Sequence, residues 1–356
     1  MNKNTKNKLA VVLVLFITTL NIVSQPTTGY YHDLDGKNTS SLKTALYTCI
    51  STHTALSYGD LWDAFRETDR RADGKVWDIY SSATNYTFGT NQCGNYSGEG
   101  SCYNREHSFP KSWFDDASPM YTDLFHLYPS DGYVNGRRSN YPFGEVGSIT
   151  YQSSGGYCKL GNASSTLGYN GTVFEPADEY KGDLARTYFY MVTSYENVVA
   201  GWYSNSEARP TLNGTTYPAF NQWVITMLLN WSRQDPVSQK EINRNNAVEQ
   251  WQNNRNPFID FAGIEEYIWG NKKSELFSMS STSTYFTTND NLKIYSTEGN
   301  IFVENCADNT IIYLYDYTGT LLKTETANSN LIKIPIQPHR FIIVKAENKV
   351  MKILTQ

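Results

Sequence analysis

Apolar side chains recur at the three- and four-residue spacing of an α-helix in five stretches of the chain. Such spacing places them along one face of a helix, which can then pack against the protein interior. The last helix should begin at a capping box, because Ser238 and Glu241 stand three residues apart ahead of the apolar positions. The five expected helices cover residues 40–50, 58–66, 183–199, 218–232 and 236–251.

Other parts of the chain have the composition of strands and loops. Residues 75–103 are rich in Tyr, Thr, Asn and Gly, which is typical of short strands joined by loops. Residues 272–291 are rich in Ser, Thr and Asn, and they predict a linker. Residues 292–356 hold short apolar runs divided by turn signals such as Glu298-Gly299-Asn300, which is the pattern of a small β-sandwich.

The first residues predict an export signal. Lys3, Lys6 and Lys8 precede the apolar run of residues 9–20, as in the basic and apolar regions of a signal peptide. The run is too short for a comfortable membrane-spanning helix. We expect residues 1–24 to be removed, so that the mature protein has no membrane span and is secreted, periplasmic or at the surface of a bacterial cell. An uncleaved anchor is the alternative.

Charge and cysteine content narrow the classes of function. The chain has 30 Lys and Arg, 35 Asp and Glu, and a net charge of −5, which argues against a generally basic nucleic-acid-binding surface. A nucleic-acid partner would therefore be held at a local site. Of the five cysteines, Cys93 and Cys102 are close enough in sequence for a local disulfide, which export permits. No cysteine pair has the CxxC spacing typical of zinc sites.

The residues that suggest catalytic chemistry gather between positions 103 and 145. Arg105, Glu106 and His107 are consecutive, and Asn135 follows later in the same segment. A neutral imidazole can deprotonate water, and carboxylate and amide oxygens are hard ligands of the kind that Mg²⁺ prefers. Hydrolysis of a phosphodiester needs an activated water, a divalent cation and cationic donors for the developing charge. The cluster therefore favours metal-assisted phosphodiester hydrolysis.

A strand–loop–strand–helix unit would bring these residues together. After a first strand and a loop, we expect a second strand over residues 123–128 and a short helix that carries Asn135, capped by Ser130 or Asp131. Adjacent side chains on a strand point to opposite faces. The neighbouring carboxylate and imidazole would therefore need an irregular backbone to share one site.

Plainer roles compete for several of these residues. His107 taken alone would be a histidine hydrogen-bonded in a loop, and Asn135 could be a capping or turn residue. Arg137 and Arg138 could form a solvated surface pair. For His126 a buried structural role competes with direct involvement, while Asp123 is expected to fix a neighbouring loop or strand end.

Two motifs carry a resemblance to a known family. The segments NREHSFPKSWF and DLFHLYPSDGYVNGRRSNYPFGE resemble those of the endonuclease I family of His-Me finger (ββα-metal) nucleases, which includes secreted ribonucleases and deoxyribonucleases. The similarity covers roughly residues 50–270. It implies an α+β fold, with a ββα-metal core embedded in a mostly helical domain over residues 25–271. Residues 292–356 resemble the sorting domains of type IX bacterial secretion, and an accessory β-domain is the alternative there.

The resemblance implies roles for individual residues. His107 matches the general base, and Glu106 and Asn135 match the ligands of one divalent ion, usually Mg²⁺, with Mn²⁺ or Ca²⁺ as other options. The arginine that stabilises the transition state corresponds to Arg105 or Arg138. Three residues are expected to support this set from around the site: His126, Asp123 and Asn140.

Taken together, the sequence predicts a secreted, metal-dependent, sequence-nonspecific endonuclease that acts on DNA, RNA or both. One alternative is an inactive protein on the same scaffold that binds nucleic acid or a surface partner. Another is a metal-dependent phosphodiesterase that acts on small substrates. The intact set of Glu106, His107 and Asn135 favours the endonuclease over the inactive form.

Overall fold

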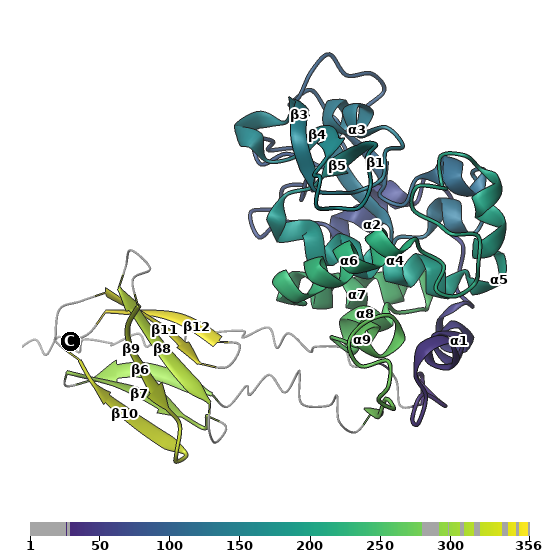
Figure 1. The fold of residues 1–356 in the computed structure, drawn as a ribbon. Coiled ribbons are helices and arrows are strands. Elements are labelled where there is room, and N and C mark those ends of the chain that lie inside the picture. Colours follow the sequence, from purple (N-terminus) through teal and green to yellow (C-terminus); the bar gives the residue numbers. More distant parts are fainter. Residues whose placement is uncertain are drawn as a thin grey trace, which may run out of the picture. The chain divides into compact units, whose positions relative to one another are not determined.

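Figure 1 shows the computed structural model, whose chain divides into two compact units at residue 279. The predicted signal peptide, residues 1–24, lies outside the described residues, as does the part of the predicted linker from 280 to 291. The structure describes residue 26 and residues 29–279, 292–297, 299–306, 310–316, 321–336, 341–346 and 349–354.

The first unit is mainly helical. Its longer helices are α1 (Thr39–Ile50), α2 (Leu61–Thr68), α4 (Lys181–Ser194), α6 (Gln222–Gln234) and α7 (Gln239–Gln252). Its shorter helices are α3 (Gly132–Arg138), α5 (Glu196–Val199), α8 (Pro257–Asp260) and α9 (Glu265–Ile268). Single 3₁₀ turns cover Lys111–Phe114, Met120–Thr122, Ser154–Gly156, Asp178–Tyr180 and Ala200–Ser204.

The predicted helices are present, with some ends shifted. The capping box of α7 is confirmed, because the Ser238 hydroxyl accepts from the Glu241 N–H and the Glu241 carboxylate accepts from the Ser238 N–H. The helix expected over residues 183–199 is interrupted at Tyr195, whose φ of −115° and ψ of 33° leave the helical region. The next helix starts only after Asn221, which is extended, so the expected start at residue 218 was too early.

The strands of the first unit form two small antiparallel sheets. One joins β1 (Tyr103–His107) to β2 (Leu127–Asp131), and the other has the order β3–β4–β5. The three strands of this second sheet are β3 (Val146–Gln152), β4 (Lys159–Ala163) and β5 (Thr172–Glu175). The second strand was expected over residues 123–128, but it starts at Leu127. Asp123 forms a turn instead, since its carboxylate accepts from the Phe125 N–H at 2.9 Å.

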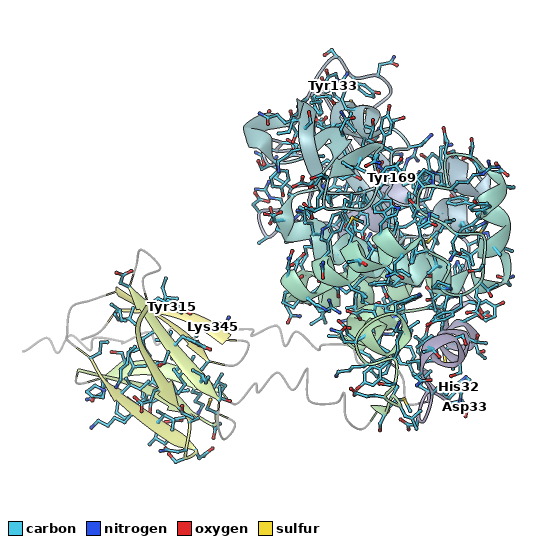
Figure 2. The ribbon with its side chains drawn as sticks, in the orientation of Figure 1. His32, Asp33, Tyr133, Tyr169, Tyr315 and Lys345 are labelled. Atoms are coloured by element: carbon cyan, nitrogen blue, oxygen red, sulfur yellow. A yellow bond between two sulfur atoms is a disulfide. The ribbon has the colours of Figure 1, made fainter. Side chains whose placement is uncertain are left out.

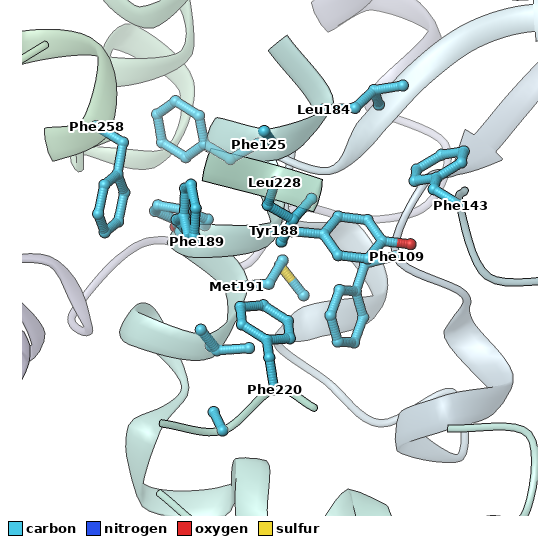
Figure 3. Packing of buried hydrophobic residues seen from close by; sticks show 14 of the residues in the cluster. Phe109, Phe125, Phe143, Leu184, Tyr188, Phe189, Met191, Phe220, Leu228 and Phe258 are labelled. Atoms are coloured by element: carbon cyan, nitrogen blue, oxygen red, sulfur yellow. The ribbon is translucent and has the colours of Figure 1, made fainter. Parts of the chain in front are cut away.

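Helix α4 occupies the centre of the core, and all of its residues are buried. Figure 3 shows Tyr188 and Met191 of this helix among aromatic rings from other elements. Polar groups of α4 also reach the segment between β1 and β2. The Tyr188 hydroxyl donates to the Ser108 carbonyl at 3.0 Å, and the Tyr190 hydroxyl donates to the Asp123 carboxylate at 2.8 Å. The core helix therefore fixes the segment that leads from one strand to the other.

Helix α7 holds the start of β2 through a buried arginine. The Arg244 guanidinium donates to the carbonyls of Leu124 and Leu127 at 2.9 and 2.7 Å. Its charge is balanced by Asp69, with an N–O distance of 2.8 Å. A buried arginine needs such partners, because an unpaired charge in the interior is costly. The β1–β2 pair is thus anchored from the helical side of the unit.

The first unit extends beyond the predicted linker boundary at residue 271. Phe277 is buried in the core, its N–H donates to the Lys37 carbonyl at 2.8 Å, and its carbonyl accepts from the Gly36 N–H at 2.9 Å. Cys93 and Cys102, whose closeness in sequence made a local disulfide possible, form one. Within the part of the chain that the structure describes, no helix is both long and apolar enough to cross a membrane.

The second unit is all-β, so the predicted α+β class with a C-terminal β region is confirmed. Its sheets have the orders β10–β7–β6 and β12–β11–β8–β9. Apolar residues of both sheets, including Ile301, Val303, Leu314 and Val344, form one core, as in a sandwich. The strands are β6 (Lys293–Thr297), β7 (Asn300–Glu304), β8 (Ile311–Asp316), β9 (Leu321–Thr326), β10 (Leu331–Pro335), β11 (Phe341–Ala346) and β12 (Lys349–Leu354).

Candidate active site

Strands β1 and β2 and helix α3 form a ββα unit (Figure 1). The helix starts at Asp131, whose carboxylate accepts from the N–H groups of Tyr133 and Val134, both at 2.9 Å. The second oxygen of this carboxylate accepts from Tyr86 and from the Gly100 N–H. Asp131 is therefore the cap, one of the two residues expected for it, and its four hydrogen bonds fix the direction in which α3 leaves the strand.

Glu106 is buried beside α3, with 2% of its surface exposed. One carboxylate oxygen, Oε1, accepts from the Tyr80 hydroxyl at 2.8 Å and pairs with the Arg138 guanidinium at 3.2 Å. Burial raises the pKa of Glu106, while Arg138 and Tyr80 act in the opposite direction. Among the described residues Oε2 has no hydrogen-bond donor, so this oxygen is the one that can bind a cation.

Asn135 projects from α3 toward β1. Its amide nitrogen donates to the side-chain oxygen of Asn104 at 2.7 Å. This bond defines the orientation of the amide, and it leaves the Asn135 oxygen as an acceptor without a donor in the described part of the chain. Asn104 and Glu106 are two residues apart on β1, so their side chains share one face of the strand. The predicted ligands Glu106 and Asn135 are thus attached to the same side of the ββα unit.

These two oxygens suit a divalent ion that keeps most of its water. No group of three or more His, Cys, Asp or Glu side chains that could hold a metal occurs among the described residues. Mg²⁺ is commonly held by only one or two carboxylates together with waters and substrate oxygens. The donor set of Glu106 and Asn135 fits that ion, and it does not fit a structural zinc site.

His107 is the last residue of β1, and its ring packs beside Tyr121 and Tyr58, whose own ring centroids are 4.8 Å apart. The centroid of the His107 ring is 5.2 Å from that of Tyr121 and 6.2 Å from that of Tyr58. Its Nε2 is 3.0 Å from the Tyr121 carbonyl, which can only accept, so Nε2 carries the hydrogen and Nδ1 keeps its lone pair. Burial lowers the pKa of His107 well below its usual value, as does the charge of the neighbouring His126.

The expected backbone irregularity at Glu106 and His107 is absent. The pairing with β2 runs without a shift from Tyr103 to His107. The carboxylate and the imidazole therefore leave opposite faces of β1, as regular pleating requires. Strand β1 ends at His107, so the two side chains flank the end of the strand on its opposite faces.

The two candidate arginines occupy different environments. Arg138 is 1% exposed and donates to the carbonyls of His107 and Ser108 in addition to its pair with Glu106. Arg105 is half-buried and lies on the same face of β1 as His107. Its guanidinium carbon is 3.5 Å from the ring centroid of Tyr58, and among the described residues it pairs with no carboxylate. Arg138 has the contacts of an internal brace, whereas Arg105 donates to the Tyr58 carbonyl at 2.7 Å and has no ion-pair partner in the described part of the chain.

The three supporting residues have separate surroundings. His126 is fully buried, its ring centroid is 5.5 Å from that of His107, and its Nε2 is 2.7 Å from the Met120 carbonyl. Asp123 accepts hydrogen bonds from Tyr190 and Tyr195. The structure does not bring Asn140 into contact with Glu106, His107 or Asn135. Its amide instead donates to the carboxylate of Glu207, at 3.0 Å.

Several neighbours of the site were missed by the sequence reasoning. Asn104 orients Asn135, Tyr80 binds Glu106, and Tyr121 and Tyr58 pack beside the His107 ring. Only Asn104 had a local signal, because strand alternation places it on the same face as Glu106. The three tyrosines reach the site through tertiary packing from other segments.

Comparison of the sequence with known proteins identifies the family of this chain. The endonuclease I family model matches residues 38–262. The chain is 36% identical over 249 residues to the extracellular ribonuclease of Bacillus amyloliquefaciens, covering 69% of this chain and 80% of that protein. Its identity to the extracellular ribonuclease of Bacillus subtilis (strain 168) is 36% over 248 residues, or 68% and 79% of the two chains. An extracellular deoxyribonuclease of Aeromonas hydrophila is 26% identical over 147 residues, or 41% and 52% of the two chains. The chain therefore belongs to the endonuclease I family.

Proposed function

We propose that this protein is a secreted, metal-dependent endonuclease that hydrolyses phosphodiester bonds of DNA, RNA or both without sequence specificity. The observation that carries the proposal is the position of His107 at the end of β1, next to Glu106 and with Nδ1 unprotonated. The names of its relatives support nuclease activity outside the cytoplasm. The predicted signal peptide fits that location.

His107 acts as the general base in this proposal. The Tyr121 carbonyl holds the Nε2 hydrogen, so Nδ1 can take a proton from a water molecule beside the phosphate. Because burial lowers the pKa of His107, the imidazole is neutral at physiological pH and able to accept that proton. The hydrogen bond of Nε2 and the stacked Tyr121 ring fix the orientation of the imidazole.

Glu106 and Asn135 supply the oxygens for a divalent ion, for which Mg²⁺ is the first candidate and Mn²⁺ or Ca²⁺ are alternatives. Bound there, the ion would neutralise phosphate charge and stabilise the leaving oxygen. Arg138 and Tyr80 hold the Glu106 carboxylate in place. Arg105, stacked on Tyr58, donates to the phosphate as its charge grows in the transition state.

The test is digestion of single-stranded DNA, double-stranded DNA and RNA by the purified protein, with Mg²⁺, Mn²⁺ or EDTA. We expect cleavage with a divalent ion and none with EDTA. His107→Ala should lower the cleavage rate by about 10²- to 10⁴-fold. His32→Ala is the matched control, because His32 is an exposed histidine of the same unit, paired with Asp33. Binding without cleavage under every condition would favour an inactive scaffold instead.

A further inference from the structure

Four side chains near the metal-ligand helix have no part in the chemistry described above. Tyr133 and Arg137 are one turn apart on α3, Tyr151 lies in β3, and Tyr96 lies in the loop that the Cys93–Cys102 disulfide closes. The Tyr133 ring centroid is 6.1 Å from those of both Tyr96 and Tyr151, edge to face in each case. The Arg137 guanidinium carbon is 4.9 Å from the Tyr151 ring centroid. We call these four residues the tyrosine platform.

The platform rests directly on the backbone of α3. A Cβ added at Gly132 would lie 3.0 Å from the Tyr96 ring and 2.5 Å from the Cys93 sulfur. One added at Gly136 would overlap the Tyr96 hydroxyl. The Tyr96 ring therefore lies along a strip of helix backbone that only glycine leaves open, and the disulfide ties its loop to that strip.

The order of residues around α3 connects the platform to Asn135. At 100° per residue, Asn135 is followed around the helix by the Gly132–Gly136 strip and then by Tyr133 and Arg137. Val134 and Arg138 occupy the remaining side of the helix, between Arg137 and Asn135, and point to the interior. Because Tyr96 covers the glycine strip, its ring lies between Asn135 and Tyr133 on the outer side of the helix.

The platform is open to solvent and carries an available cation. Tyr96 is 44% exposed, Tyr133 and Tyr151 are half-buried, and Figure 2 shows Tyr133 at one end of the first unit, far from His32 and Asp33. Arg137 is exposed, and it has no carboxylate partner among the described residues. Burial raises the pKa of Tyr151, and the nearby Glu99 carboxylate raises it further. The tyrosine rings therefore suit a flat, neutral group, and only the side of the platform at Arg137 suits a phosphate.

We propose that the tyrosine platform is a stacking subsite for a base of an unpaired nucleic-acid strand, next to the phosphate that is cleaved. The proposal rests on the proposed nuclease function and adds a preference for unpaired substrate. Unpaired bases stack on aromatic side chains, whereas bases in a duplex already stack on their neighbours. A strand with its phosphate near Asn135 would meet Tyr96 first and Tyr133 next.

The test measures KM and kcat for an unstructured oligonucleotide and for the same oligonucleotide in a duplex. Loss of one stacking ring corresponds to a roughly 5- to 100-fold rise in KM. We expect that rise for Tyr96→Ala on the unpaired strand, with kcat unchanged and little effect on the duplex. Tyr96→Phe keeps a ring and should behave like wild type. Tyr203→Ala is the matched control, because Tyr203 is also an exposed tyrosine beside an arginine. It is 41% exposed, and its ring centroid is 5.6 Å from the Arg209 guanidinium carbon.

Binding provides the second arm, which does not depend on cleavage. Fluorescence anisotropy would give the Kd of the labelled unpaired oligonucleotide for His107→Ala and for the double variant with Tyr96→Ala. We expect the double variant to bind about 5- to 100-fold more weakly. An unchanged KM and Kd, or an equal loss on the duplex, would overturn the subsite. If the wild type cleaves nothing, the nuclease proposal fails, and the Kd comparison still decides the subsite.

Discussion

The side-chain amide of Asn135 donates to the side-chain oxygen of Asn104 at 2.7 Å, and this bond ties helix α3 to the strand that carries Glu106. It also sets the orientation of the Asn135 amide, whose oxygen is then the free acceptor. Because Asn104 and Glu106 share one face of β1, the two proposed metal ligands are held on one frame. The bond therefore fixes helix α3 relative to strand β1, and with it the relative position of the two proposed ligands.

Asn104→Ala should raise the Mg²⁺ concentration needed for half-maximal cleavage by about 10- to 100-fold, as is typical when a residue that orients a metal ligand is lost. Asn104→Asp keeps an acceptor oxygen for the Asn135 amide and should not raise the Mg²⁺ concentration needed for half-maximal cleavage. A metal titration of the cleavage rate measures both variants. An Asn104→Ala protein with the wild-type metal requirement would show that the bond does not position Asn135.

Substitution of the two arginines should have different effects. Loss of Arg138 should mainly lower stability, and loss of Arg105 should mainly lower activity. Arg138→Ala leaves the buried Glu106 without its cation, which should lower the free energy of unfolding by about 3–5 kcal/mol. Arg105→Ala removes no ion pair, so its unfolding free energy should fall less, by about 1–2 kcal/mol for the lost hydrogen bond to the Tyr58 carbonyl and the lost ring contact. Its kcat should fall by roughly 10²- to 10³-fold, the usual cost of losing a donor to the transition state.

Denaturant unfolding and single-turnover cleavage measure these two effects. Arg105→Lys is the conservative control, because it keeps the charge but loses the planar stacking on Tyr58. The assignment is contradicted if Arg138→Ala is as stable as wild type, or if Arg105→Ala keeps its full kcat.

The Cys93–Cys102 disulfide should stabilise the start of α3. It closes a short loop that packs on Gly132, and removal of such a crosslink typically costs about 2–4 kcal/mol. We expect the double serine variant to lose that amount in denaturant unfolding and to cleave more slowly, because α3 carries Asn135. Cys49→Ser is the control, since Cys49 is not in a disulfide. If wild type, the double serine variant and Cys49→Ser were equally stable, the crosslink would have no stabilising role.

Stability should depend on pH through Asp78. Burial raises the pKa of this carboxyl to about 7, against about 3.9 in the unfolded chain. The folded state therefore holds the proton more tightly. This stabilisation is complete at a pH below the pKa of the unfolded state, and it is lost as the pH rises through the pKa of the folded state. The loss amounts to at most about 4 kcal/mol. Asp78→Asn stays neutral, so the wild type should lose stability relative to this variant between about pH 4 and pH 7.

Denaturant unfolding of both proteins across this range measures the difference. Asp73→Asn is the matched control, because Asp73 is an exposed acid of the same segment that pairs with Arg71. A constant difference between wild type and Asp78→Asn over the whole range would contradict the raised pKa.

Periodicity predicted the five longer helices of the first unit, and local chemistry predicted the order of the ββα unit, whereas the short helices α5, α8 and α9 were not predicted as separate helices. The capping box of α7 depends on neighbours in sequence, so the sequence predicted it, and for the same reason it narrowed the cap of α3 to Ser130 or Asp131. The sheet β3–β4–β5 was missed because Val146–Gln152 is largely exposed and has no alternating apolar pattern. The partners of the site residues were also missed. Tyr80, Tyr58 and Arg244 reach the ββα unit from other segments, and such contacts have no local signal.

The most direct test of the account is chemical rescue of His107→Ala. The rate of a single turnover is measured with saturating Mg²⁺, with and without added imidazole, next to wild type. If His107 is the general base, the variant should lose about 10²- to 10⁴-fold in rate and regain part of it with imidazole, while EDTA abolishes all cleavage. A variant that cleaves at the wild-type rate without imidazole would contradict the account.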